Sequence, residues 1–254
     1  MLFDLSHFCR TKLKSMQHGG IVNRTTLFFC NHFASVVKAW KDELNDKLFR
    51  LKMLLVPGLF IMYSAVTQRL GDYVEMRKGA QLEDKLLTLF PSFDFSTPVF
   101  ILLYASLFVL VLTHLSKPKI ILRLIEMHFC VAVIRQACIL LVALEPPSGI
   151  ILLKDVFLEN TFYPHHTPLT KDLFFSGHVA SIWIYFLCAE KKYLKICLVF
   201  AAFLMSFMVL SMRVHYTYDV YGAVLFTTII YYAPAWIRTY YVSKETLSTS
   251  ELKQ

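Results

Sequence analysis

The sequence lacks the features that mark several common classes of protein. Its six cysteines include no CxxC pair, so we predict neither a zinc site nor a disulfide framework and expect small buried thiols instead. No internal repeat and no low-complexity segment occurs. No basic motif with interleaved aromatic residues occurs either, so the net charge of +8 does not indicate a nucleic-acid partner. Residues 1–25 contain no apolar signal core, so we expect no cleaved leader.

Apolar residues dominate what is present. Hydrophobic residues make up 56% of the chain and its mean hydropathy is +0.53, which is high for a soluble protein. Several apolar runs approach the roughly 20 residues that a spanning helix needs. We therefore predict an all-α, polytopic integral membrane protein with six transmembrane helices in one bundle. The spans are expected at 51–67, 97–115, 120–144, 173–190, 193–212 and 218–237.

The N-terminal 50 residues form the one long polar stretch. Apolar residues recur in it at a helical period, with charged residues on the other faces. The recurring residues are Phe33, Val37, Trp40, Leu44, Leu48 and Leu51. This pattern predicts an amphipathic helix on the membrane surface, and a solvated or partner-binding cytosolic helix is the alternative. We expect a cytosolic segment over 1–50, a membrane domain over 51–240 and a cytosolic tail over 241–254.

The distribution of lysine and arginine predicts the orientation in the membrane. The N-terminal segment, the turns after the second and fourth spans and the tail are basic. The loop at 145–172 has only Lys154 and Lys171, and the loop at 68–96 has four bases against five acids. Both termini are therefore expected in the cytosol. Both long loops are expected to face the periplasm, the cell exterior or an organelle lumen.

Two histidines and a carboxylate flank the fourth and fifth predicted spans. His178 begins the fourth span and His215 follows the fifth, so a helix that crosses and a helix that returns bring both to one membrane face. Asp219 follows His215 by four residues, so on a helix the two side chains share one side. A carboxylate can fix the tautomer of a nucleophilic imidazole, while a second imidazole protonates the leaving oxygen. The pattern predicts phosphoryl transfer, with His215 as nucleophile and His178 as general acid.

Four further residues are candidates for substrate binding. Ser176 and Gly177 stand at the start of a predicted helix, whose amides and dipole favour an anion. Arg135 lies inside the third span, where an arginine is a functional candidate, and a structural pair with a carbonyl or carboxylate is the alternative. Arg213 can neutralise phosphate from the end of the fifth span, or lie in the loop. We expect no metal and no cofactor, because histidines and arginines supply the charge and the proton transfer.

The segments Lys171-Asp172-Leu-Phe-Phe-Ser-Gly-His178 and His215-Tyr-Thr-Tyr-Asp219 have counterparts in a known family. They resemble the Gly-Asp-Phe/Tyr-Leu-Phe-Ser-Gly-His and His-Tyr-Thr-x-Asp segments of the sphingomyelin synthase-like branch of the type 2 phosphatidic acid phosphatase superfamily. Arg135 followed by Glu145-Pro-Pro-Ser-Gly resembles that branch's arginine and Leu-Pro-x-Pro-Gly turn. The Lys-x₆-Arg-Pro motif of the wider superfamily is missing, which favours a phosphodiester over a phosphate monoester.

The resemblance covers about residues 100–240 and implies six spans with an outward-facing site. It implies that His178, His215 and Asp219 are catalytic. The implied enzyme transfers a phospho-head group through a phosphohistidine, with a phospholipid and a ceramide or diacylglycerol as its lipid partners. One alternative is a hydrolase, either a lipid phosphatase or a phospholipase C-like enzyme. A second alternative is a non-catalytic lipid-binding or transport protein.

Overall fold

The computed structural model describes residues 24–154 and 169–251 of the chain. Within these ranges the regular structure is helical, with no strand and one isolated bridge between Ala80 and Leu144. The helices are α2 (Arg24–Leu44), α3 (Lys47–Met76), η1 (Leu87–Leu89), α4 (Ser96–His114), α5 (Pro118–Leu141), α7 (Gly177–Cys188), α8 (Lys192–Ser211) and α9 (Thr217–Glu251). The chain is therefore all-α over the described residues, as its hydropathy pattern predicts.

Each of the six predicted spans coincides with one of these helices. Among the described residues, four helices are long and apolar enough to cross a membrane: α3, α4, α5 and α8. Helix α7 is apolar but has 12 residues, which is short of the usual spanning length. These helices fit an integral membrane protein. Six crossings of the membrane remain a prediction.

Two predicted boundaries are wrong. The amphipathic helix expected from Phe33 to Leu51 is interrupted, because α2 ends at Leu44 and Asp46 caps a new helix by accepting a hydrogen bond from the Leu48 amide at 2.9 Å. Helix α3 then continues to Met76, so the loop expected at 68–96 begins only after that residue. Three of the charged residues in the predicted loop, Arg69, Asp72 and Glu75, lie instead on the last two turns of α3, and the others follow it.

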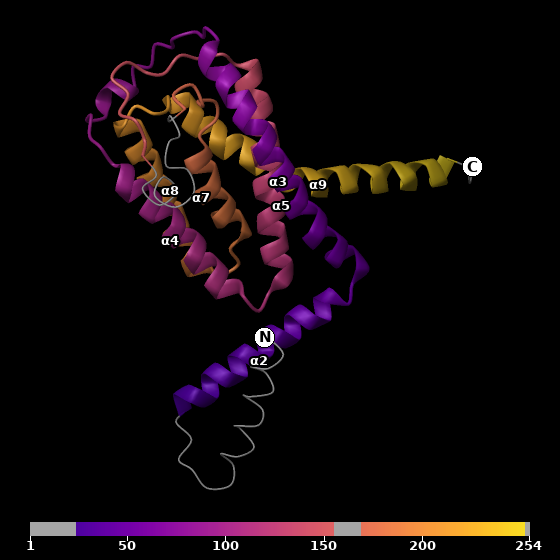
Figure 1. The fold of residues 1–254 in the computed structure, drawn as a ribbon. Coiled ribbons are helices and arrows are strands. Elements are labelled where there is room, and N and C mark those ends of the chain that lie inside the picture. The colour runs from indigo at the N-terminus through magenta and orange to yellow at the C-terminus, as the bar shows by residue number, and fades with distance from the viewer. Residues whose placement is uncertain (1–23, 155–168, 252–254) are drawn as a thin grey trace, which may run out of the picture.

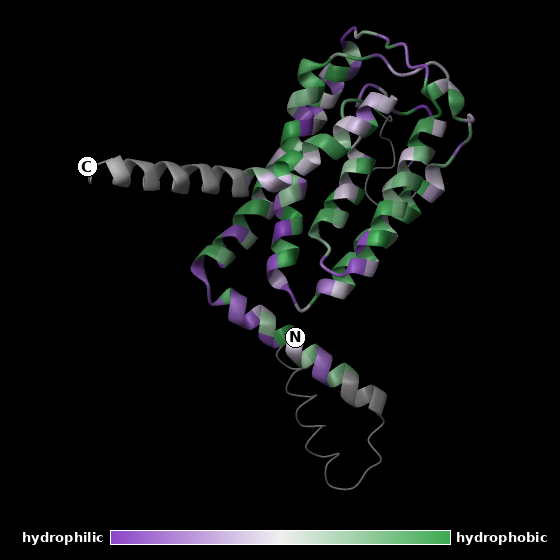
Figure 2. Cartoon of the chain, turned by 180° about the vertical axis from the view of Figure 1, so that it is seen from behind, coloured by the Kyte–Doolittle hydropathy of each residue, from purple (hydrophilic) through white to green (hydrophobic). Residues whose placement is uncertain are grey.

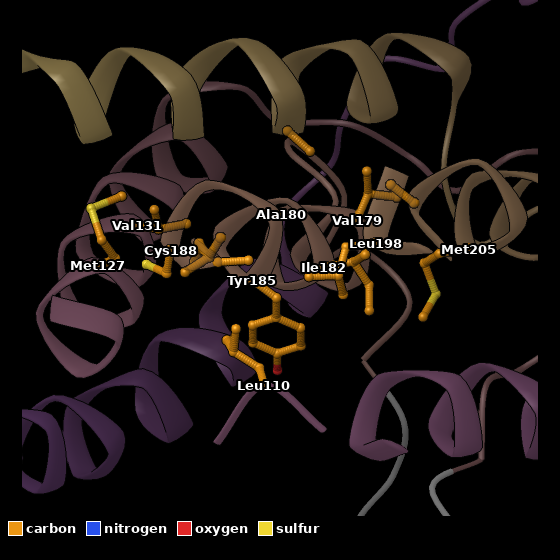
Figure 3. Close-up of a cluster of buried hydrophobic side chains, with 14 of the residues drawn as sticks. Leu110, Met127, Val131, Val179, Ala180, Ile182, Tyr185, Cys188, Leu198 and Met205 are labelled. Atoms are coloured by element: carbon orange, nitrogen blue, oxygen red, sulfur yellow. The ribbon is translucent and has the colours of Figure 1, made fainter. Parts of the chain in front are cut away.

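Helix α7 is at the centre of the bundle. It packs against α4, α5, α8 and α9, and Ile182 and Ile184 on different faces of it are both buried. Figure 3 shows the buried cluster that its side chains form with those of α4, α5 and α8. A helix that is apolar all round is stable where neighbours enclose it on every side. This enclosure explains why a helix of only three turns holds a fixed position.

The outer faces of the bundle are apolar and exposed. Leu54 on α3, Phe108 on α4 and Phe203 on α8 are 76%, 63% and 71% exposed. Figure 2 shows the hydrophobic colouring along the long helices of the bundle, whereas α2 is mixed. Side chains of this kind suit contact with lipid chains rather than with water.

The loops separate into two groups at opposite ends of the bundle (Figure 1). The segment after α3, the segment after α5 and the turn between α8 and α9 meet at one end. The short turns after α4 and α7 lie at the other end, where Lys117 pairs with Glu190. Helix α2 lies beyond that second end, where the Trp40 indole donates to the Leu115 carbonyl at 2.8 Å. His215 lies in a turn of the first group, between α8 and α9.

Candidate active site

The fold brings His178 and His215 together at the loop-rich end of the bundle. His178 is the second residue of α7, and His215 lies in the turn between α8 and α9. Their ring centroids are 6.5 Å apart, with the ring planes at 60°. Phe100 of α4 packs edge-on against His178 at 5.6 Å between centroids. Two residues that are 37 positions apart in the sequence therefore share one small space.

Asp219 contacts His215 on the Nδ1 side of its ring. Its Oδ2 lies 3.3 Å from His215 Nδ1 and accepts the Tyr216 amide at 2.8 Å. The carboxylate is fully buried and His215 is 4% exposed, so water competes little for this contact. The expectation that both residues lie on one helix is wrong, because α9 begins at Thr217 and His215 precedes it. When Nδ1–H donates to the carboxylate, Nε2 is the nitrogen left for a substrate.

The start of α7 is packed closely against α9. The Ser176 amide donates to the Asp219 carbonyl at 3.1 Å, and the Ser176 side chain caps α7 at the Val179 amide. Gly222 makes this approach possible, since a Cβ there would lie 3.0 Å from the Phe174 ring. Ser176 is fully buried and is not among the residues that line the cavity described next. Its observed contacts are structural.

A cavity of about 310 Å³ lies beside the two histidines. Its polar lining includes Arg135 from α5 and Asp172 from the segment before α7, together with His178 and His215. Its other lining residues are Leu103, Ile150, Leu152, Leu153, Leu169, Thr170, Gly177, Ser181 and Val214. Polar and apolar side chains thus contribute about equally to the walls, which suits an amphiphilic ligand.

Arg135 makes three polar contacts with the chain segment that leads into α7. Its Nη1 lies 3.0 Å from Asp172 Oδ1, its Nη2 donates to the Asp172 carbonyl at 3.1 Å and its Nε donates to the Phe175 carbonyl at 2.5 Å. The guanidinium also lies against Gly177, where a Cβ would be 3.3 Å from Nε. These contacts match the structural pair that the sequence left open as an alternative. These contacts use three of the five N–H donors of the guanidinium, and Arg135 also lines the cavity.

Asp172 is the site residue that sequence reasoning overlooked. Its side chain is 38% exposed and lines the cavity. Burial tends to raise its pKa, but the charge and hydrogen bond of Arg135, supported by the nearby His215 and His178, hold the pKa below its usual range. The cavity therefore contains a carboxylate next to both imidazoles. The sequence signal for Asp172 was its position six residues before His178, within the segment that resembles a family motif.

Arg213 lies outside the cavity. Its Nη1 donates to the Ser148 carbonyl at 2.9 Å, and its backbone φ of 55° is in the left-handed region. Gly149, which also has a positive φ of 76°, lies against the same side chain. Arg213 therefore fastens the turn after α5 to the turn after α8. Over the part of the chain that is described, no three His, Cys, Asp or Glu side chains gather as a metal site would require.

Comparison with known proteins adds one finding. Residues 171–235 match the family described as PAP2 superfamily, C-terminal. The match spans α7, α8 and the first half of α9, with both histidines and Asp219. It supports a relationship to the type 2 phosphatidic acid phosphatase superfamily and suggests a membrane-embedded lipid phosphatase or phosphotransferase. No curated protein and no solved structure matches this chain.

Proposed function

We propose that this protein transfers the phospho-head group of a phospholipid to a lipid alcohol, through a phosphohistidine on His215, as sphingomyelin synthase-like enzymes do. The observation that carries the proposal is the pair of histidine rings 6.5 Å apart on one cavity, with the buried Asp219 behind His215. A phosphate about 3 Å from one ring would lie close to the other ring as well, so one histidine can attack the phosphorus while the other gives a proton to the leaving oxygen.

The proposed reaction has two steps. His215 Nε2 attacks the phosphorus, the bond to the diacylglycerol oxygen breaks, and His178 gives that oxygen a proton. An alcohol such as a ceramide-type lipid then enters, His178 takes its proton, and its oxygen attacks the phosphohistidine to restore His215. Asp219 holds the Nδ1 proton throughout and stabilises the imidazolium. Proton transfer of this kind contributes about 10²- to 10⁴-fold in rate.

The charge of the cavity supports a phosphodiester substrate. Arg135 and Asp172 form an ion pair, so together they add no net charge beside the histidines. Arg213 is engaged by Ser148 outside the cavity. A phosphate monoester with two negative charges would need more cations than the described cavity offers, whereas a phosphodiester with one negative charge needs fewer. Binding of phosphate by Ser176 or Arg213 would need a rearrangement of the contacts described above, whereas Arg135 and Gly177 line the cavity.

A hydrolase is the second candidate, because the matched family is a phosphatase family. The same first step forms the phosphohistidine, and water replaces the lipid alcohol in the second. The products are then a diacylglycerol and a free phosphorylated head group, as from a phospholipase C. The two reactions differ only in what resolves the intermediate.

The test uses purified protein in bilayers that contain a phospholipid labelled in its head group, with and without ceramide. A labelled ceramide product supports the transferase, and a water-soluble labelled head group supports the hydrolase. An acid-labile label on the protein that disappears in His215→Ala supports the intermediate. If neither product nor labelled protein forms with choline, ethanolamine, glycerol and serine phospholipids, both enzyme proposals fail and a lipid-binding protein remains.

A further inference from the structure

Two carboxylates from the N-terminal third of the chain contact the segments that contain the catalytic residues. Glu75 lies in the last turn of α3, and Asp84 lies in the loop that follows. Both are outside residues 171–235, which match the family, and neither lines the cavity. They are called the carboxylate clamp below.

Glu75 holds the segment that leads to Asp172 and His178. Its Oε1 accepts the backbone amides of Thr170 at 2.5 Å and Lys171 at 2.7 Å. Its Oε2 accepts the Thr170 hydroxyl at 2.9 Å. Three hydrogen bonds to one ionised carboxylate are stronger than the same number between neutral groups, so they fix this segment firmly on the end of α3.

Asp84 holds the turn that contains His215. Its Oδ2 accepts the Thr217 amide at 2.7 Å and the Thr217 hydroxyl at 2.8 Å. Its Oδ1 accepts the Leu87 amide at 3.1 Å, which fixes the carboxylate on η1. Thr217 lies midway between His215 and Asp219, so the contact sets the backbone on which the histidine–aspartate pair depends.

Glu145 connects the two halves of the carboxylate clamp. Its Oε1 accepts from Lys171 Nζ at 2.9 Å and from the Gly79 amide at 2.8 Å, and its carbonyl accepts the Tyr216 hydroxyl at 2.9 Å. The Gly79 amide, then Lys171, lower the pKa of Glu145, so the carboxylate stays ionised over a wide pH range. The segments on either side of the two histidines are therefore attached to the same piece of chain.

We infer that Glu75 and Asp84 are positioning residues: they set the distance between His178 and His215, and the site is incomplete without α3 and the loop after it. This inference rests on the proposed phosphoryl transfer for its effect on rate. A misplacement of about 1 Å can cost on the order of 10²-fold in rate even when the altered residue is far from the chemistry. Loss of the carboxylate clamp is therefore expected to lower kcat more than it raises KM, because neither residue lines the cavity.

The experiment compares Glu75→Ala, Glu75→Gln and Asp84→Ala with Asp94→Ala in full-length protein in bilayers. Asp94 lies in the same loop as Asp84 and accepts hydrogen bonds from the Ser96 amide and hydroxyl at the start of α4, rather than from either histidine segment. We expect kcat to fall about 10- to 100-fold in the two clamp alanine variants, with KM changed less than about threefold. The amide oxygen of a glutamine at 75 can accept both backbone amides and its NH₂ group can donate to the Thr170 hydroxyl, so Glu75→Gln should recover most of kcat. Asp94→Ala should keep kcat.

Hydrogen exchange of backbone amides gives a readout that does not need turnover. Asp84→Ala should speed exchange over 215–219 and Glu75→Ala over 170–172, and Asp94→Ala should alter neither. Thr217→Val, which removes one of the two hydrogen bonds to Asp84 with little change in shape, should give a smaller effect in the same direction as Asp84→Ala. It serves in place of Asp84→Ala if that variant does not fold.

Two kinetic results would overturn the inference: parental kcat in the clamp variants, or an equal loss of kcat in Asp94→Ala, which would indicate general destabilisation. Parental exchange over 215–219 in both Asp84→Ala and Thr217→Val would also overturn it. If the parent protein turns over no phospholipid, the proposed function fails, and the exchange measurements still decide whether the clamp fixes the two segments.

Discussion

At the scale of single residues, His215 combines burial, a carboxylate partner and a place on the cavity wall. Replacing it removes the protein atom that the proposed mechanism uses as its nucleophile in the first step. We expect His215→Ala to lose at least about 10³-fold in turnover while the melting temperature stays close to the parent's. The measurement is phospholipid turnover beside detergent melting. His32→Ala, at an exposed position of α2, is the control and should keep full activity.

The ion pair between Arg135 and Asp172 makes the stability of the folded protein depend on pH. The pKa of Asp172 in the folded protein lies below the ordinary value of about 3.9, mainly because Arg135 outweighs the effect of burial. Ionised Asp172 therefore stabilises the fold fully above pH 4, and this contribution is lost as the pH falls through the lower folded value. We expect the melting temperature of the parent to fall more than that of Asp172→Asn between pH 6 and pH 3. Parallel melting curves would show that the ion pair adds nothing.

At the scale of elements, the junction between α7 and α9 sets the geometry of the site. It depends on Gly222, whose missing side chain lets α9 approach Phe174 and Phe175. A methyl group there must displace a ring or the helix, at a cost of about 1–3 kcal/mol. The displacement also moves Asp219, which lies one turn earlier on the same helix.

We therefore expect Gly222→Ala to lower both the melting temperature and kcat. Gly58→Ala is a matched control, because Gly58 lies inside helix α3 with nothing within 4 Å of the new methyl group. Alanine favours a helix interior over glycine by about 1 kcal/mol, so the control should be as stable as the parent or more stable. Similar melting temperatures for the two variants would show that the α7–α9 contact tolerates more space than the structure indicates.

At the scale of the whole molecule, the site and the long loops share one end of the bundle, while α2 and the short basic turns share the other (Figure 1). The charge asymmetry predicts that the second end faces the cytosol. In a cysteine-free background, we expect Ser148→Cys to react with an impermeant thiol reagent on intact cells. Ser250→Cys should react only after the membrane is opened. The reverse pattern would place the site in the cytosol.

Local properties of the sequence determined much of the architecture. Each apolar run that hydropathy identified overlaps a helix of the described residues. An apolar run is removed from water equally well by protein or by lipid, so its presence can be read without knowing which of the two covers it. The number of residues in each run and the alternation of crossing helices predicted that His178 and His215 lie at one end. The histidine–aspartate spacing predicted their contact, although the actual backbone is a turn followed by a helix start.

Only the tertiary structure decided the partners of the charged groups. Arg135 meets the segment around Asp172, 37 residues further on, and Glu75 and Asp84 meet segments 95 and 133 residues away. A hydrogen bond depends on distances of a few tenths of an ångström and on angle, and no periodicity in the sequence encodes such a distance between remote segments. The two histidines and the aspartate of the proposed site could therefore be named from the sequence, whereas the residues that hold their segments in place required the fold.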